Sequence, residues 1–425
     1  MPRRGGLGTG RGRIIAAALA AAIVAELAVI GLSPSDIGPA PAPVDVATTF
    51  DGARVERARE FHDGQRAVFL VGLAIELGAL ALLATGRPRV TRRLLERAGE
   101  RPLLGAAAAG AAISLALALL ALPTGALAHG RAADAGLSTQ GSLSWLADQG
   151  RSAAIAAISA AAGAVVLIGL QRRLPRAWWV PGSVIVVIYA TVSTWLAPVV
   201  LAPLFNDFRA LPDGPVRSEV LGLAERAGVD VGEVLRVDAS RRSTTLNAYV
   251  DGIGSSKRVV LYDNLLDRAE GPALRSVVAH ELGHVAHRDI ARGLLFLALV
   301  APLGMLTVAL AGGALARRSG AGEAAPAALP AYALAVTVVA LGLNLFGDGL
   351  SRRVEASADR FALELTDDPR GFIDLQRRLA LANLSDPDPS SPIDAVLRTH
   401  PTTVERIGAA IAYRNERRDA AEGAS

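Results

Sequence analysis

Residues 276–289 read SVVAHELGHVAHRD, and this stretch decides how the rest of the chain is interpreted. On a helix, His280 and His284 are one turn apart and lie on the same face. Two imidazoles in that arrangement can hold one zinc ion, and Glu281 can act as general base on the water that the metal binds. The motif also arises by chance, so the prediction of a metallopeptidase depends on whether the chain supplies a third ligand.

The composition indicates a membrane protein. Of the 425 residues, 51% are hydrophobic and 4% aromatic, and the mean hydropathy is +0.36, which is too apolar for an ordinary soluble domain. The chain has no cysteine, which leaves histidine and carboxylate side chains as metal ligands. The net charge is +4, and nearly all the positive side chains are arginine. This preference for arginine over lysine is typical of GC-rich, bacterial genomes. These arginines border apolar runs and form no basic face interleaved with aromatic residues, so nucleic-acid binding is not expected.

Seven apolar runs are long enough to cross a bilayer. The first follows a basic, Gly-rich leader (residues 1–13) and is interpreted as an uncleaved span, because it is long for a signal peptide and no clear cleavage site follows it. Polar loops are predicted at residues 33–66, 86–102 and 123–152. The predicted spans are residues 14–32, 67–85, 103–122, 153–170, 179–201, 294–316 and 327–346.

Two charged segments follow the first five spans and are separated by the last two. The first contains an amphipathic helical pattern and a helix bearing the histidine pair (residues 215–227 and 271–289). It also contains three strand patterns, residues 233–238, 246–250 and 258–262, the last two joined through Asp251-Gly252. A helix is predicted at residues 351–366. The resulting division is a transmembrane domain (1–201), a metallopeptidase part (202–293), a transmembrane hairpin (294–350), a second metallopeptidase part (351–419) and a disordered tail (420–425).

Two histidines leave a zinc ion undersaturated, so a third ligand is needed. Ile290 stands where H-E-x-x-H-x-x-G-x-x-H sites place a third histidine. No acidic residue follows until the end of the sixth span, which leaves Glu323, Asp348, Glu355 and Asp359 as candidates. Glu323 lies in a Gly/Ala loop, a poor support for a ligand. Glu355 and Asp359 are one helical turn apart, so one can bind zinc while the other orients a ligating histidine.

These features together resemble the type-1 CaaX prenyl endopeptidase family of membrane-embedded, gluzincin-type zinc metallopeptidases. HELGH, two spans and EASAD carry the resemblance, together with PLFNDF (203–208), LNAY (246–249), KRVVLYDNLL (257–266) and THPTTVERI (399–407). The resemblance is detailed from about residue 202 to 411 and rests on the number and order of spans before that. It implies a mainly α fold, a seven-transmembrane-helix bundle with a gluzincin-like α+β zinc metallopeptidase domain split around a transmembrane hairpin.

The resemblance also assigns the catalytic centre. It implies one Zn²⁺ per chain, held by His280, His284 and Glu355, with Glu281 as the base. Asp359 becomes the partner that orients a ligating histidine.

Four further positions follow from the same resemblance. Asn247 and Ala248 would present their backbone to an extended peptide, as strand addition requires. His400 would help to stabilise the oxyanion, and Arg406 would brace the site. Family members often have Asn, His or Ser at the position of Leu246, so side-chain contacts at that position stay open.

Other ionisable residues are interpreted more simply. His287 lies roughly on the face of His280 but beside charged residues, and is interpreted as a surface or outer-shell histidine; His62 and His129 are assigned to solvated loops. Glu26 and Glu76 lie inside predicted spans, where a carboxylate costs about 2.5–3.5 kcal/mol at the bilayer centre. Either the water-filled chamber that the resemblance implies houses them, or they are protonated or near a span end.

The expected function is that of an integral-membrane zinc metalloendopeptidase acting on peptides or membrane proteins, in contact with the lipid bilayer. Membrane-protein quality control or peptide processing fits a bacterial source better than prenylated substrates. One alternative is a site-2-type intramembrane protease with Asp348 as ligand, which the charged residues around HELGH disfavour. The other is a non-catalytic, zinc-stabilised scaffold, which the intact Glu281 disfavours. The sequence does not indicate an oligomeric state.

The expected location is the bacterial cell membrane. Seven spans place the N-terminus and the catalytic segments on opposite sides. Fifteen arginines flank the spans on the N-terminal side and six lie in the opposing loops, which predicts a cytoplasmic N-terminus and an external active site. The family resemblance implies a cytoplasmic active site instead. A reporter fused at Ser425 distinguishes the two orientations.

Overall fold

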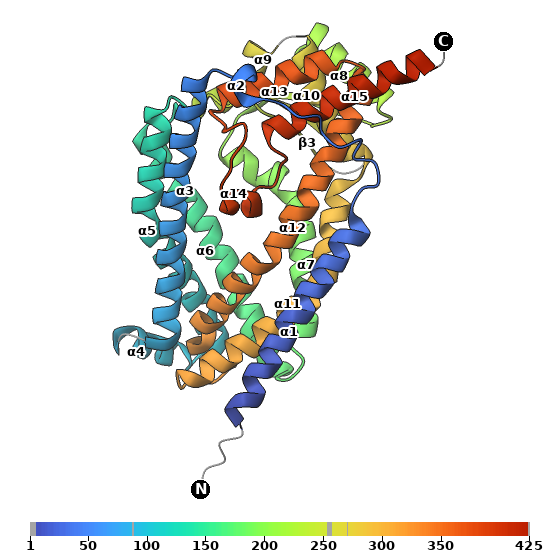
Figure 1. The fold of residues 1–425 in the computed structure, drawn as a ribbon. Coiled ribbons are helices and arrows are strands. Elements are labelled where there is room, and N and C mark those ends of the chain that lie inside the picture. Colours follow the sequence, from blue (N-terminus) through green and yellow to red (C-terminus); the bar gives the residue numbers. More distant parts are fainter. Residues whose placement is uncertain (1–5, 87–88, 253–256, 270, 424–425) are drawn as a thin grey trace.

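A computed structural model describes residues 6–86, 89–252, 257–269 and 271–423. The first five residues of the basic leader, residues 87 and 88 of the arginine-rich loop, and residues 424 and 425 of the predicted tail lie outside the described residues. Long helices make up most of the molecule, and a small sheet with shorter helices lies at one end of them (Figure 1). The N-terminus lies at the opposite end, so the first helix leads toward the catalytic segments.

Seven helices in the described part of the chain are long and apolar enough to cross a membrane, which confirms the predicted number. They comprise α1 (Gly6–Leu32), α3 (Gly52–Ala81), α5 (Pro102–Asp134), α6 (Ser142–Arg173), α7 (Trp179–Leu196), α11 (Asp289–Arg318) and α12 (Leu329–Thr366). α1 packs against α11 and α12, whereas α5 packs against α3 and α6. Small residues permit these contacts: a Cβ on Gly110 of α5 would lie 2.6 Å from the carbonyl oxygen of Ala160 in α6.

Except for α7, the spanning helices are longer than the predicted spans, so the predicted polar loops are partly wrong. α3 already begins at Gly52, where the Asp51 side chain accepts the Arg54 N–H at 3.0 Å, and α5 continues to Asp134. The predicted helix 351–366 is the last part of α12, so the predicted boundary after residue 350 falls within one helix. An apolar run marks only the part of a helix that lies in lipid, and polar residues can continue the helix beyond it.

Shorter helical segments lie between the longer elements. They are α2 (Val46–Thr49), α4 (Arg89–Ala98), the π-helical turns η1 (Leu82–Gly86) and η2 (Ala197–Leu201), and the 3₁₀ turns η3 (Ala202–Leu204), η4 (Ala239–Arg241) and η6 (Pro326–Ala328).

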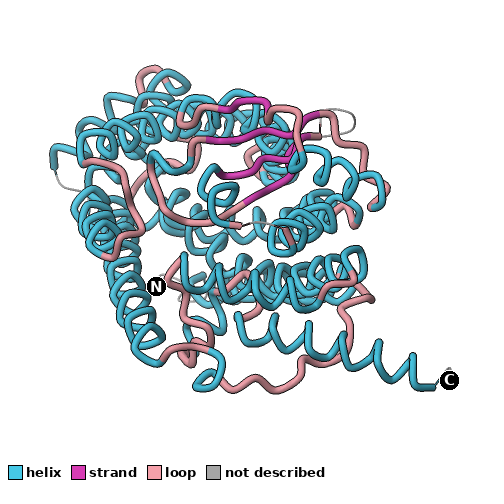
Figure 2. Tube along the Cα trace, turned by 90° about the horizontal axis from the view of Figure 1, so that it is seen from above, coloured by secondary structure: helices cyan, strands magenta, loops and turns pink. Residues whose placement is uncertain are grey.

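A mixed four-stranded sheet forms in the order β1-β2-β4-β3 (Figure 2). Its strands are β1 (Phe208–Ala210), β2 (Glu233–Val237), β3 (Ala248–Asp251) and β4 (Arg258–Tyr262). β2 and β4 are parallel, and the other two pairs are antiparallel. The three predicted strands are present, with β3 displaced to begin two residues later, and the short β1 was not predicted. β3 is an edge strand of this sheet, so one side of its backbone has no neighbouring strand among the residues that the structure describes.

An apolar core joins the sheet to three helices: α8 (Pro215–Arg226), α10 (Pro272–Ala286) and α13 (Pro369–Ala382). Fully buried side chains from β4, α10 and α13, such as Val259, Val278 and Leu375, hold α10 under the sheet. The remaining helices are α9 (Asp263–Arg268), α14 (Pro392–Leu397) and α15 (Thr403–Gly423). Because Ala and Glu favour helix, α15 continues through residues 420–423, where disorder was predicted wrongly.

The helix that carries the histidine pair is shorter than predicted. α10 begins at Pro272 and ends at Ala286, whereas the pattern predicted residues 271–289. Arg288 has a left-handed backbone (φ 56°), which ends one helix and lets α11 begin at Asp289. This break separates the histidine pair from the sixth span, and it changes the direction from which Asp289 faces α10.

Candidate active site

His280 and His284 project from the same face of α10. Their Nε2 atoms lie 3.2 Å apart, and the His280 side chain is buried. Two unprotonated imidazole nitrogens at this separation repel each other unless a proton or a cation lies between them. The face of α10 that carries them turns toward α12.

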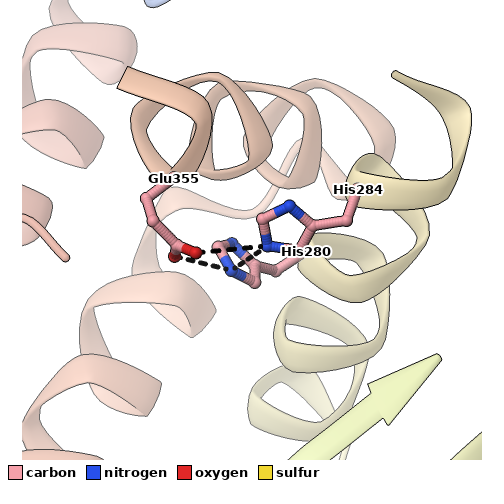
Figure 3. Close-up of side chains that lie close together, drawn as sticks. All are labelled: His280, His284 and Glu355. Atoms are coloured by element: carbon pink, nitrogen blue, oxygen red, sulfur yellow. Dashed lines mark hydrogen bonds and ion pairs between the residues drawn. The ribbon is translucent and has the colours of Figure 1, made fainter. Parts of the chain in front are cut away.

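α12 supplies a carboxylate to the same point. The Glu355 oxygens lie 3.3 Å from His280 Nε2 and 3.5 Å from His284 Nε2 (Figure 3). Ligand atoms of the three residues all lie within 4.8 Å of one another. Oε2 of Glu355 is buried and accepts no hydrogen bond from any described residue. Because a buried carboxylate oxygen is costly to leave unpaired, the arrangement fits a metal ion held by two imidazoles and one carboxylate.

The close approach of α10 and α12 depends on Gly283, the fourth residue of the HELGH motif. A Cβ at this position would lie 3.3 Å from the Ala358 Cα and 3.1 Å from the Phe361 ring. Glycine therefore lets the backbones of the two helices pack closely beside the three ligands.

Carboxylates orient both imidazoles from behind. Asp359 Oδ1 lies 2.9 Å from His280 Nδ1, one turn along α12 from Glu355. Asp289 Oδ2 lies 2.9 Å from His284 Nδ1, and Arg292 is paired with Asp289 at 3.3 Å. Each carboxylate fixes the proton on Nδ1, which leaves Nε2 free to bind a metal.

Sequence reasoning missed the role of Asp289. It used this residue only to argue that HELGH lies outside an apolar span. The available signal was an acidic residue shortly after the second histidine, but a continuous helix would have carried it off the face of His284. The left-handed Arg288 returns it to that face, and neither Gly nor Asn marks the turn in the sequence.

Arg406 braces the group from α15. Its Nε donates to Asp359 Oδ2 at 2.8 Å, its Nη2 contacts Oδ1, and Nη2 also lies 3.4 Å from His280 Nδ1. A capping box fixes the start of α15: the Thr402 N–H donates to Glu405, and the Glu405 N–H donates to the Thr402 hydroxyl. This local structure places Arg406 as the fourth residue of α15, at the end of its capped first turn.

The charges around the two imidazoles are mostly negative. Burial lowers the pKa of His280, but the adjacent carboxylates of Asp359 and Glu355 outweigh it and raise the pKa to about 10. Burial raises the pKa of Glu281, against the attraction of His280 and His284. The resulting site stabilises positive charge at the imidazoles, and a bound cation would supply that charge in place of protons.

The remaining predicted site residues surround a cleft of about 500 Å³. Asn247, Glu281 and His400 all line it. The side chain of His400 is 59% exposed, and its Nε2 lies 3.4 Å from Glu355 Oε1. Ala248 is buried at the start of β3, behind the part of the cleft lined by Asn247.

The backbone of the β3 edge differs from the expectation. The carbonyl of Asn247 accepts the Tyr262 N–H from β4 and is therefore turned away from the cleft. The N–H of Ala248 faces the free edge, where it donates to the side-chain oxygen of Asn247 at 3.0 Å. Of the two predicted residues, Ala248 offers its backbone to the edge and Asn247 offers its side chain.

The other candidate ligands lie apart from this group. Among the residues that the structure describes, the group that could hold a metal contains Glu355 and neither Asp348 nor Glu323. Glu323 pairs with Arg317. His287 contacts the Ser357 hydroxyl at 3.2 Å and the Phe361 ring, so it packs against α12 beside the group.

Two other histidines have different surroundings from those predicted, and two glutamates within the spans line cavities. His129 stacks on Trp145, with ring centroids 5.2 Å apart, and His62 contacts Phe61. Both lie on helices, where solvated loops were predicted. Glu26 and Glu76 line cavities of about 830 and 1010 Å³.

Comparison with known proteins agrees with this site. The model of peptidase family M48 matches residues 210–414, the part of the chain that contains every residue of the group. A site of this kind, with one ligand on a helix that continues into a membrane span, defines an integral-membrane metalloprotease, a hydrolase of peptide bonds. Residues 210–414 therefore form a peptidase of family M48.

The relatives extend the likeness beyond the catalytic part. The uncharacterized metalloprotease YhfN of Bacillus subtilis (strain 168) is 27% identical over 369 residues, covering 85% of this chain and 87% of its own length. The CAAX prenyl protease 1 homolog of Arabidopsis thaliana is 32% identical over 234 residues, 52% of this chain and 53% of that protein. The crystal structure of S. mikatae Ste24p matches with a TM-score of 0.76 at 19% identity, covering 94% of this chain and 99% of that chain. The last likeness establishes the common fold.

Proposed function

We propose that this protein is a zinc metalloendopeptidase that cleaves membrane-associated proteins or peptides. One observation carries the proposal: His280, His284 and Glu355 converge on one point beside Glu281, at the wall of an open cleft. Two imidazoles and a glutamate are a donor set of catalytic zinc sites, in which a fourth position stays open for water or substrate. Oε2 of Glu355 is buried and accepts no hydrogen bond from a described residue, which supports a cation at this point.

The residues of the chain divide the chemistry between them. When bound, zinc would polarise the scissile carbonyl and lower the pKa of the attacking water. Glu281 takes the proton from that water and passes it to the leaving amine, and burial, which raises its pKa, makes it a stronger base than an exposed glutamate. His400 lies beside the ligands with an exposed ring, from which it can donate to the developing oxyanion. Asp359 and Asp289 hold the two imidazoles in place.

The position of the cleft supports membrane-associated substrates. Glu355 lies on the same continuous helix as the seventh span, so a substrate held in the bilayer can reach the cleft without leaving the membrane surface. Some relatives carry the name CAAX prenyl protease 1. The arginine-biased, bacterial composition favours membrane proteins under quality control, or processed peptides, over prenylated proteins as substrates of this chain.

The test separates zinc binding from catalysis. Glu281→Gln should retain one zinc per chain by metal analysis and lose cleavage of casein by about 10²–10⁴-fold, because the base is removed while the ligands remain. Chelator treatment and zinc addition of the wild-type protein provide the control. Retained proteolysis in Glu281→Gln contradicts the mechanism. Membrane proteins or peptides captured by this variant in cells identify the substrate class, and capture of neither kind contradicts that part of the proposal.

A further inference from the structure

The free edge beside the cleft begins before β3. Leu246 and Ala248 turn their backbone groups outward, because the intervening Asn247 turns its carbonyl toward β4. The Leu246 side chain is buried in the core of the sheet, while its backbone lines the cleft. We call the outward-facing backbone of residues 246–251 the substrate rail, because an extended peptide that adds to the sheet must pair with it.

A side chain from another element already pairs with one end of this rail. Asn383, the residue that caps the C-terminus of α13, accepts the Leu246 N–H on its Oδ1 at 3.0 Å. Its Nδ2 donates to the Leu246 carbonyl at 3.4 Å. The amide of Asn383 therefore satisfies both backbone groups of Leu246, as a residue of a neighbouring strand would.

The chain around Asn383 holds the amide at this position. Asn383 is half-buried in the cleft wall, and its N–H caps α13 by donating to the Leu379 carbonyl. Leu384 follows in the left-handed region (φ 49°), which leucine rarely adopts. Such strain persists only where surrounding contacts over-determine it, and here it turns the chain away directly after the amide.

The contact at Ala248 is of a different kind. Its N–H is bonded once, to the exposed side chain of the adjacent Asn247. Rotation of that side chain exposes the N–H without moving any other element. Leu246 is held by two bonds from a residue 137 positions later in the chain. The two ends of the rail therefore differ: Ala248 can exchange its partner for a peptide, and Leu246 keeps its partner.

We propose that Asn383 is the stop of the substrate rail and fixes how far a bound peptide extends along it. This inference rests on the proposed peptidase function. A substrate strand pairs with the rail from Ala248 toward Asp251. It cannot pair with Leu246, because the Asn383 amide already occupies the backbone groups of that residue, so the substrate leaves the sheet edge there. Asn383 thereby limits, on one side of the scissile bond, the number of substrate residues that contribute to binding.

The experiment measures how binding and cleavage depend on peptide length. Quenched fluorescent peptides are built on one short casein sequence and are extended by one alanine at a time toward either end. For the wild type, kcat/KM should stop rising on one side while the peptide is still short. In Asn383→Ala, further residues on that side should raise kcat/KM about threefold to tenfold, mainly through KM, because one or two backbone hydrogen bonds become available. Asn383→Asp, which keeps the acceptor for the Leu246 N–H, should show a smaller gain.

The controls separate a stop from a merely structural role. Arg377→Ala changes an exposed side chain on α13 and should leave the length profile unchanged. A uniform loss at every peptide length in Asn383→Ala overturns the proposal, as does an equal change of profile in Arg377→Ala. The affinity of the same peptides for zinc-loaded Glu281→Gln, with and without Asn383→Ala, reports on the rail without turnover. If that affinity shows the shifted length profile but the wild type cleaves nothing, the proposed function fails and the stop stands; an unshifted profile overturns the stop.

Discussion

Asp289 Oδ2 lies 2.9 Å from His284 Nδ1, although the left-handed Arg288 places the two residues on different helices. Asp289→Ala should weaken zinc binding by about 10–100-fold, because the ring of His284 loses the partner that fixes its orientation and its tautomer. Competition with a chromophoric chelator measures the affinity. Asp374→Ala, which breaks an exposed ion pair with Arg378 on α13, is the matched control and should bind zinc as the wild type does. Equal affinities in the two variants would exclude this role for Asp289.

Gly283 sets the separation of the helices that carry the three ligands. In Gly283→Ala the new Cβ would meet backbone at 3.3 Å, so α12 must move by a few tenths of an ångström and take Glu355 with it. We expect the free energy of unfolding to fall by about 1–3 kcal/mol and zinc binding to weaken. Thermal unfolding measures the first effect and metal analysis the second. Gly293→Ala in α11, whose Cβ would meet nothing within 4 Å, should leave both unchanged or slightly raise the stability. The same change of stability and zinc binding in both variants would show that the effect comes from helix propensity and not from the packing of α10 against α12.

The third ligand can be tested by comparing two acidic residues of α12. Glu355→Ala should lose bound zinc and all peptidase activity, because only two ligands remain. Asp348→Ala should keep its zinc, since Asp348 lies outside the described group of ligands. Metal analysis after gel filtration measures both. Loss of zinc from Asp348→Ala with retention in Glu355→Ala would instead support a site-2-type arrangement.

Asp263 links the end of β4 to the turn η4 and gives stability a dependence on pH. Burial raises the pKa of its carboxyl, but hydrogen bonds from the side chain and backbone of Ser240 and from the Asn264 N–H outweigh this, so the pKa lies below its ordinary value. The stabilisation is therefore present above the unfolded-state pKa of about 3.9 and is lost as the pH falls through the lower folded-state pKa.

Asp263→Asn should accordingly be less stable than the wild type by about 1–3 kcal/mol at pH 7, and the difference should shrink below about pH 4. Thermal unfolding of both proteins after chelation measures this without a contribution from bound metal. A difference that stays constant from pH 7 to pH 3 would exclude the carboxylate charge as its source.

The sequence predicts those parts of the molecule that are determined by local composition. Apolar runs predict the seven spans, because a helix in lipid needs an apolar surface. Alternating apolar residues predict three of the four strands. The helix ends are predicted less well: α5 and α6 continue through polar residues that no bilayer constrains. The short edge strand β1 has too few residues for a periodicity to appear.

The candidate site divides in the same way. His280, Glu281 and His284 are adjacent in sequence, so a helical period brings them together. Glu355 comes to them only through the packing of α10 against α12, and the sequence offered it as one of several acidic residues until the family resemblance selected it. The positions of Asp289 and Asn383 depend on the left-handed residues next to them, Arg288 and Leu384. A left-handed residue is predictable from sequence mainly where it is Gly or Asn, and these two are neither.

The continuity of α12 makes the catalytic centre sensitive to the membrane itself. At 38 residues the helix is about 57 Å long, nearly twice the roughly 30 Å of a hydrocarbon core. A helix of this length responds to a thinner or thicker bilayer by changing its tilt. Because Glu355 lies on this helix, a change in its tilt displaces Glu355 relative to His280 and His284, whose helix α10 packs against the sheet. We therefore expect the chain length of the surrounding lipids to influence the geometry of the site and the rate of catalysis.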